Sequence, residues 1–148
     1  MRQVLLVAHL LGFVLWMGGA FAAMTVGLAA RREDRAVLGA LVRLQGSVYR
    51  FLITPGALLT VISGLILTLR LSGVMPAMSP WLFVMQGAGL LAGALTLGLI
   101  VPTAARLTRL DPEGQRDLFI ALRQRQMRLG MVSGLLGLLA LVAGAMLR

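Results

Sequence analysis

The sequence contains no cysteine and no lysine, and it has only five acidic residues and a single histidine, His9. Without cysteine, the chain cannot form disulfides, thiolate metal sites or cysteine nucleophiles. The acids all lie in two short charged segments, residues 31–35 and 111–117. No carboxylate therefore falls within an apolar run, where proton-coupled transporters need one. Phosphate-binding loops, hydrolase triads, carboxylate pairs and zinc motifs are also missing, and these absences favour a non-enzymatic protein.

Long apolar runs dominate what is present. The chain has 148 residues, of which 59% are hydrophobic and 13% charged, and its mean hydropathy is +0.92. A soluble domain of this length is less apolar and more charged. We therefore predict an all-α polytopic membrane protein, with one domain over residues 1–148. The expected spans are about 4–30, 51–69, 80–105 and 129–147, arranged as an up-down-up-down four-helix bundle in the lipid bilayer.

The formal net charge of +9 comes entirely from arginine. Eleven of the fourteen arginines lie in the segments 31–50 and 106–128, and only Arg2, Arg70 and Arg148 lie elsewhere. The positive-inside rule explains this distribution better than nucleic-acid binding does. We expect a bacterial inner membrane protein with both loops cytoplasmic, where the arginines contact anionic lipid. Both termini are then expected to be periplasmic.

One face of the first helix organises the rest of the prediction. At helical spacing it carries His9, Gly12, Trp16, Gly19 and Ala23, which combines one ionisable group and one large aromatic with very small residues. Such a face allows close helix packing and directs its polar group inward. We expect the other three helices to pack around it.

Two interpretations of His9 follow. An ionisable residue at membrane depth is a functional candidate, here an axial haem or metal ligand. Alternatively, His9 is a neutral structural histidine that forms a hydrogen bond across the bundle to Gln86 or Ser63. Trp16 is expected either to stack on a flat cofactor, haem b, or to fill the space over the glycines. A bis-histidine haem within one chain is excluded, because there is no second histidine.

Methionines and glycines suggest two further features. Met75 and Met78, with Met85 nearby, have thioethers that can bind Cu(I), although the nine methionines can equally fill gaps in the bundle. In the fourth span, the glycines recur on one face and predict a seam for close helix approach; they are Gly130, Gly134, Gly137 and Gly144. Residues 36–50 look like an amphipathic lead-in to the second span, and about 112–128 is expected to be helical.

The pattern His9-x6-Trp16-x-Gly18-Gly19 resembles the membrane domain of CopD-type copper-resistance proteins and the HemJ-type protoporphyrinogen oxidases. More of the chain resembles a related family of uncharacterised bacterial four-helix integral membrane proteins. In that family a basic loop is followed by a Thr-Pro start to the second helix, as at Thr54-Pro55, and Trp81 matches the tryptophan that opens the third helix. The HemJ resemblance implies that His9 binds haem. HemJ-type enzymes also have a lysine in the third helix, whereas this chain has Val84-Met85-Gln86 there.

The functional hypotheses therefore differ in class. The leading one is a non-enzymatic accessory or scaffold subunit, which packs against other membrane proteins or against a second copy of itself. The alternatives are a haem-binding redox protein of the HemJ type that uses His9 with Trp16 beside the cofactor, and periplasmic copper handling through Met75 and Met78.

Overall fold

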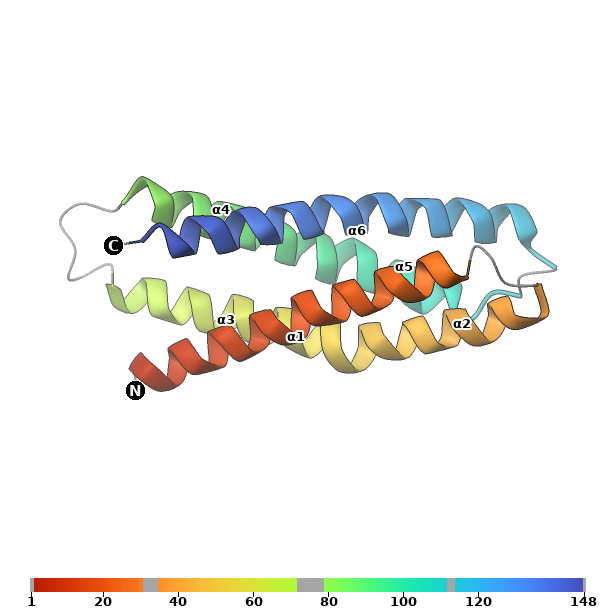
Figure 1. Ribbon diagram of the computed structural model, residues 1–148, viewed down its shortest axis with the longest axis horizontal. Helices are drawn as coiled ribbons and strands as arrows, with labels where there is room; N and C mark the ends of the chain where they lie inside the picture. Colours follow the sequence, from red (N-terminus) through yellow and green to blue (C-terminus); the bar gives the residue numbers. More distant parts are fainter. Residues whose placement is uncertain (1, 31–34, 72–78, 112–113, 148) are drawn as a thin grey trace.

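The structure is a computed structural model that describes residues 2–30, 35–71, 79–111 and 114–147, and it consists of four long helical rods lying side by side (Figure 1). The first rod is α1 (Arg2–Ala29), and the fourth is α6 (Arg116–Ala145). The second joins α2 (Arg35–Val48), the π-helix η1 (Tyr49–Ile53) and α3 (Thr54–Leu71). The third joins α4 (Pro80–Leu95), the π-helix η2 (Thr96–Ile100) and α5 (Val101–Leu107). The described residues form no strand.

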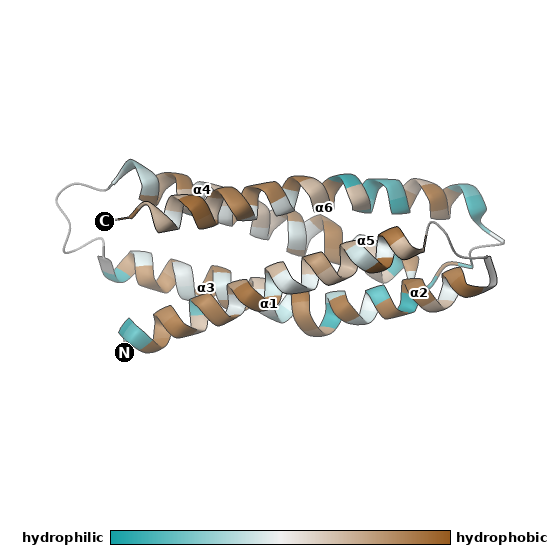
Figure 2. Cartoon of the chain, viewed as in Figure 1, coloured by the Kyte–Doolittle hydropathy of each residue, from teal (hydrophilic) through white to brown (hydrophobic). Residues whose placement is uncertain are grey.

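All four rods are long and apolar enough to cross a membrane, over Arg2–Ala29, Val37–Arg70, Pro80–Leu107 and Arg116–Ala145. Apolar colouring covers most of their length (Figure 2). We consider the most apolar segment of each rod. Only 17–28% of that segment is buried inside the bundle, so most of its side chains lie on the outer surface. An outer surface of this kind requires lipid rather than water around it. The predicted four-helix membrane bundle is confirmed.

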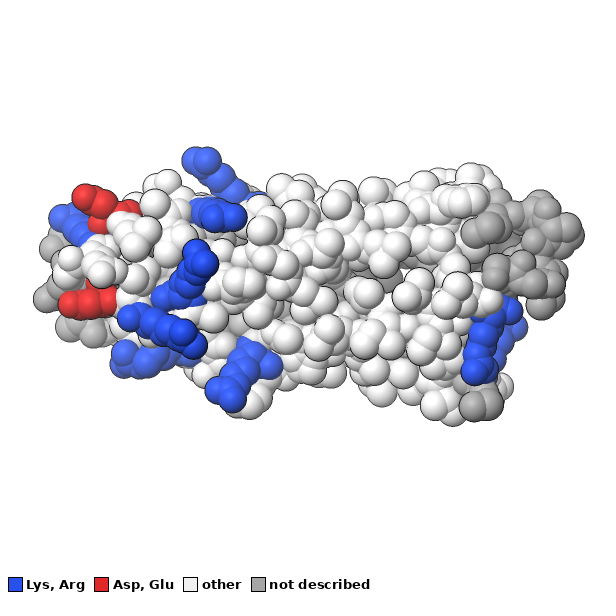
Figure 3. Space-filling model, turned by 180° about the vertical axis from the view of Figure 1, so that it is seen from behind, with Lys and Arg blue, Asp and Glu red and all other residues white. Residues whose placement is uncertain are grey.

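The two ends of the bundle differ in charge. The N-terminus and the C-terminus lie at the same end (Figure 1). Arginines gather at the opposite end, and a wide belt without charge separates them from the few arginines near the termini (Figure 3). A belt of this kind is where the hydrocarbon of a bilayer would surround the protein.

The most extensive helix contact in the described part of the chain joins α1 and α3, and glycines allow it. A Cβ atom on Gly12 would lie 2.8 Å from the Thr60 nitrogen, and one on Gly56 would lie 2.5 Å from the Trp16 nitrogen. Gly12, Trp16, Gly19 and Ala23 are all buried, so the predicted packing face of the first helix is confirmed. The expectation that all three other helices pack around this face holds only in part. The backbones pair mainly as α1 with α3 and α4 with α6.

Methionine side chains pack against two glycines of α6: Met17 reaches Gly137 from the other helix pair, and Met85 reaches Gly144 from α4 of the same pair. A Cβ atom on Gly137 would lie 2.8 Å from the sulfur of Met17, and one on Gly144 would lie 3.2 Å from the sulfur of Met85. Gly130 and Gly134 face open space. The predicted glycine seam of α6 is therefore not a site of close helix approach within the bundle, because flexible thioether side chains occupy half of it.

Two prolines explain the two π-helical segments. Pro55 and Pro102 each lie two residues after a π-helix ends. Proline lacks the amide hydrogen of a regular helix and its ring collides with the carbonyl four residues earlier. The chain responds with wider turns, in which Thr54 N–H donates to the Tyr49 carbonyl and Val101 N–H donates to the Thr96 carbonyl, both five residues back. The helix continues past each proline, so residues 36–50 are continuous with the second span, as predicted.

The fourth rod begins later than expected. The sequence predicts helix from about residue 112, but α6 starts at Arg116. Gly114 and Gln115 form a turn, in which Gln115 N–H donates to the Asp111 carbonyl. Residues 112 and 113 lie outside the described residues.

We expect Gly12→Ala to destabilise the bundle and Gly87→Ala not to. A methyl group on Gly12 would overlap α3, which costs about 1–3 kcal/mol for an overpacked core. Nothing lies within 4 Å of a Cβ on Gly87, so the alanine there gains up to about 1 kcal/mol of helix propensity. Thermal unfolding of both variants in the same detergent measures the difference, and equal melting temperatures would contradict the packing.

Candidate functional site

His9 lies about two helical turns from the start of α1, where it packs against α3. Its Nδ1 is 2.9 Å from the Thr60 carbonyl oxygen and 3.3 Å from the Ser63 Oγ. The imidazole rests on Gly64, where a Cβ atom would lie 2.8 Å from the ring Cε1. The ring therefore fits against α3 only because residue 64 has no side chain.

These contacts determine which ring nitrogen carries the proton. A carbonyl oxygen can only accept a hydrogen bond, so Nδ1 must donate to Thr60. The Ser63 hydroxyl donates its own hydrogen to the Leu59 carbonyl, so it too can only accept from His9. A neutral His9 consequently has its unprotonated lone pair on Nε2, which forms no hydrogen bond within the described part of the chain. This arrangement, with one nitrogen bound to a carbonyl and the other free, is the one found in metal-bound histidines.

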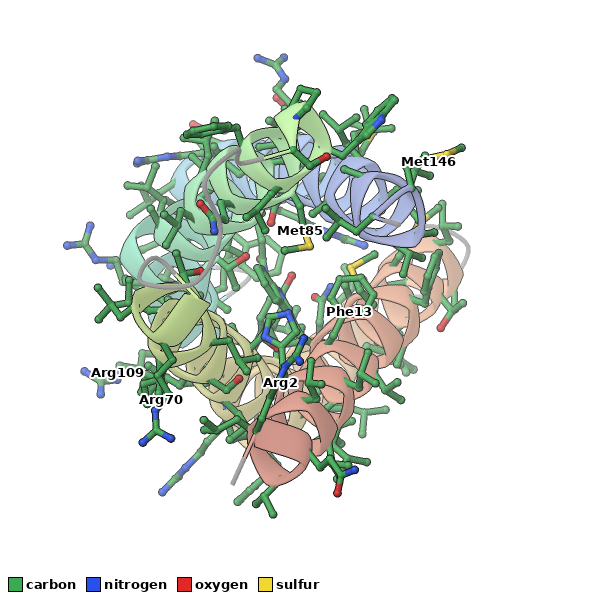
Figure 4. All side chains as sticks on the ribbon, turned by 90° about the vertical axis from the view of Figure 1, so that its left-hand side faces the viewer. Arg2, Phe13, Arg70, Met85, Arg109 and Met146 are labelled. Atoms are coloured by element: carbon green, nitrogen blue, oxygen red, sulfur yellow. The ribbon has the colours of Figure 1, made fainter. Side chains whose placement is uncertain are left out.

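Only one of the two predicted structural partners is next to His9. Ser63 is in place, whereas Gln86 donates instead to the Thr68 hydroxyl at 2.8 Å, and Thr68 in turn donates to the Gly64 carbonyl at 2.9 Å. The Gln86 bond links the third rod to the second close to the histidine, whereas the Thr68 bond lies within α3. Seen along the bundle axis, Arg2, Phe13 and Met85 lie within the ring of helices, whereas Arg70, Arg109 and Met146 point away from it (Figure 4).

Trp16 belongs to the packed core of the bundle. It is 4% exposed and lies in a buried cluster with Tyr49 and Ile53. Its ring reaches towards α4, where a Cβ atom on Gly93 would lie 3.9 Å from the Trp16 Cη2. This contact agrees with the expectation that Trp16 fills the space over the glycines. Stacking on a cofactor stays a prediction.

A second polar layer, which the sequence analysis missed, joins α6 to the two π-helices. The Thr96 and Ser133 hydroxyls are 2.8 Å apart, and Ser133 also donates to the Ala92 carbonyl at 3.3 Å. Tyr49 forms a side-chain hydrogen bond with Gln126. Gln126 and Ser133 are seven residues apart and both are buried, so they share one face of α6. The sequence contained one indication of this layer: two polar residues lie seven residues apart, on one face of a largely apolar helix.

The end of α1 is held by side chains from two other rods. Gln45 donates to the Ala23 carbonyl at 2.8 Å, and Arg123 donates to the Gly27 carbonyl at 3.1 Å. The Gly27 carbonyl is among the last four of α1, which lack a partner within the helix, and the helix dipole also favours a cation there.

The sequence profile of a family described as a predicted integral membrane protein (DUF2269) matches residues 3–147. The chain belongs to this family. No curated protein and no solved structure matches it. The match confirms the predicted likeness to an integral membrane protein family, while the likeness to CopD-type and HemJ-type proteins stays a prediction.

The described part of this DUF2269 chain has no group of three or more histidine, cysteine or acidic side chains that could hold a metal ion. The predicted copper ligands Met75 and Met78 lie outside the described residues. The structure therefore places His9 and Trp16 in the bundle and leaves the copper hypothesis as a prediction.

Proposed function

We propose that this DUF2269 protein is a non-enzymatic accessory or scaffold subunit that packs against other membrane helices. The observation that carries this proposal is a set of three small residues on the third rod that point out of the bundle beside exposed leucines. Gly87 and Ala94 of α4 and Gly98 of η2 are exposed there, next to Leu90 and Leu91, and nothing lies within 4 Å of a Cβ atom on either glycine.

The glycines at helix contacts inside the bundle differ from these exposed glycines. Gly12, Gly56 and Gly93 are each within 3 Å of a neighbouring atom at the Cβ position, so the fold itself uses them. The fold does not use Gly87 or Gly98 in this way, although each lowers helix propensity. Outward small residues let another transmembrane helix approach closely, and helix association in lipid depends on that kind of packing.

We expect Gly87→Leu to remove a co-purifying membrane partner, or a second copy of the chain, without unfolding the protein. Gly18→Leu is the matched control, because Gly18 is equally exposed and open but lies on α1. Native mass spectrometry of protein extracted in mild detergent measures the assembly. A wild-type protein that is always a lone monomer would refute the proposal, as would equal assembly by both variants.

A second candidate function is haem binding through His9. The unpaired Nε2 favours it, because Nδ1 is held by the Thr60 carbonyl and the other ring nitrogen would be available to bind iron. A haem there would supply one-electron chemistry, and His9 would provide one axial ligand with Nδ1 donating to Thr60.

Absorption spectra of the oxidised and reduced protein, purified from haem-replete cells, test this candidate. We expect a Soret band in the wild type, its loss in His9→Ala and its retention in Ser63→Ala, since Thr60 still accepts from Nδ1. Because His9 is the only histidine, no other histidine can replace it as a ligand, and an unchanged melting temperature of His9→Ala would show that the loss does not come from unfolding. A colourless wild-type protein would refute haem binding and would mean that His9 has a structural role.

We also propose that the arginine-rich end faces the cytoplasm of a bacterial inner membrane, with both termini periplasmic. The distribution of arginine between the two ends supports this orientation. The absence of cysteine permits a direct test with Gln3→Cys and Gln115→Cys, which lie at opposite ends. An impermeant maleimide added to spheroplasts should label only Gln3→Cys, and the reverse pattern would show the opposite orientation.

A further inference from the structure

The two helix pairs are joined firmly at the arginine-rich end of the bundle. The α1 pair consists of α1 and the second rod, and the α6 pair consists of the third rod and α6. Arg123 of α6 donates to the Gly27 carbonyl of α1 at 3.1 Å, and the Thr108 side chain packs directly against Gly46 of α2. A buried apolar cluster at this end draws on both pairs, and its members are Val42 of α2, Leu107 of α5 and Phe119 of α6.

The contacts between the pairs are weaker towards the end that carries the termini. Gln86 of α4 donates to the Thr68 hydroxyl of α3 at 2.8 Å, across the boundary between the pairs. A Cβ atom on Gly137 of α6 would lie 2.8 Å from the Met17 sulfur of α1. A bond between two neutral side chains contributes little, and a thioether changes its conformation easily. Separating the pairs at this end therefore costs less than separating them at the arginine-rich end.

The boundary between α1 and α6 already contains open space. Arg123 and Gly137 both contact α1, so they mark the face of α6 that is directed at α1. Gly130 and Gly134 lie between them on the same face and are half-buried, yet nothing lies within 4 Å of a Cβ atom on either. The two helices are also the first and the last of the chain, so no loop joins them directly. This boundary is free to widen.

The two π-helices lie at the same level of the bundle. Tyr49, the first residue of η1, bonds Gln126, and Thr96, the first residue of η2, pairs with Ser133. The second and third rods run in opposite directions (Figure 1), so both π-helices lie along the stretch of α6 between Gln126 and Ser133. Helices bend at wide turns beside proline, so both middle rods can bend at this one level.

Each pair is held together beyond this level, towards the termini. Gly12 and Gly56 bring the backbones of α1 and α3 into contact, and Ser133 of α6 donates to the Ala92 carbonyl of α4 at 3.3 Å. A bend at η1 and η2 would therefore move α3 together with α1, and α4 together with α6, as two units.

We propose that the two pairs part and close again at the end that carries the termini, bending at η1 and η2 while the arginine-rich end stays joined. The hydrogen bond from Gln86 to Thr68 is the latch of the closed form. Opening widens the boundary between α1 and α6 and increases access to the His9 Nε2, the ring nitrogen that is not bound to the Thr60 carbonyl. The motion concerns the helices themselves, so it does not depend on which ligand His9 binds.

The experiment compares Gln86→Leu with Gln45→Leu. Each variant removes one glutamine hydrogen bond between two rods, but Gln45 donates to the Ala23 carbonyl within the α1 pair and serves as the matched control. Thr68→Val removes the same latch as Gln86→Leu from its other side. The thermal unfolding of each variant in the same detergent shows whether it is folded.

Pulsed electron paramagnetic resonance measures the opening, because the chain has no cysteine and accepts two spin labels at chosen cysteines. One label pair replaces Val4 of α1 and Val142 of α6, which are 71% and 51% exposed, and the other replaces Val37 of α2 and Leu118 of α6 at the arginine-rich end. The first pair should show a short and a long distance. Gln86→Leu and Thr68→Val should raise the ratio of long to short about fivefold, the effect of one lost hydrogen bond.

The Gln45→Leu variant should keep the wild-type ratio, and the label pair at the arginine-rich end should show a single distance in every variant. An unchanged ratio in both latch variants would overturn the proposal, as would an equal change in Gln45→Leu or an equal separation at the arginine-rich end.

A chemical probe tests access to His9 without any cofactor. Diethyl pyrocarbonate modifies neutral histidine, and this chain has one histidine and no lysine. Mass spectrometry of the modified protein should show a reaction at His9 about fivefold faster in Gln86→Leu than in the wild type or Gln45→Leu. Equal rates in all three proteins would refute the link between the opening and His9.

Discussion

The structure depends on the contact between α1 and α3, where Gly12 and Gly56 let two backbones approach without side chains between them. In lipid there is no hydrophobic force to draw apolar helices together, so close packing and hydrogen bonds must do so. The same approach brings the His9 ring onto Gly64 and within 2.9 Å of the Thr60 carbonyl. The orientation of the histidine is therefore a consequence of the glycine contact, and its free Nε2 follows from that orientation.

Polar side chains in the interior form hydrogen bonds within the protein, as backbone groups must in the hydrocarbon of a membrane. None of the buried side-chain nitrogen or oxygen atoms in the described residues lacks a hydrogen-bond partner. Thr60 and Thr68 donate to carbonyls of their own helix, and Thr96 pairs with Ser133 across two helices. The wider turns before Pro55 and Pro102 have the same origin, since proline removes a donor and the chain rearranges rather than ending the helix.

The two ends of the bundle offer different chemistry. The end that carries the termini holds His9 against the second rod, with Arg2 and Met85 inside the ring of helices (Figure 4). The other end presents arginine on its outer surface, where Gly46 and Thr108 bring α2 and α5 together.

The sequence by itself determined the class of the protein, the four spans and the buried face of α1. Hydropathy, helical periodicity and the position of charge are local properties of the chain, so they can be counted without knowing what lies opposite. It also singled out His9 and named Ser63 as a partner, because a lone ionisable residue in an apolar helix needs one. Only the tertiary structure decided that Gly137 and Gly144 receive methionines while Gly130 and Gly134 stay open, and that Gln126 and Ser133 of α6 pair with Tyr49 and Thr96. These features depend on which residues far apart in the chain meet, and helices of nearly uniform hydropathy carry little local information about their neighbours.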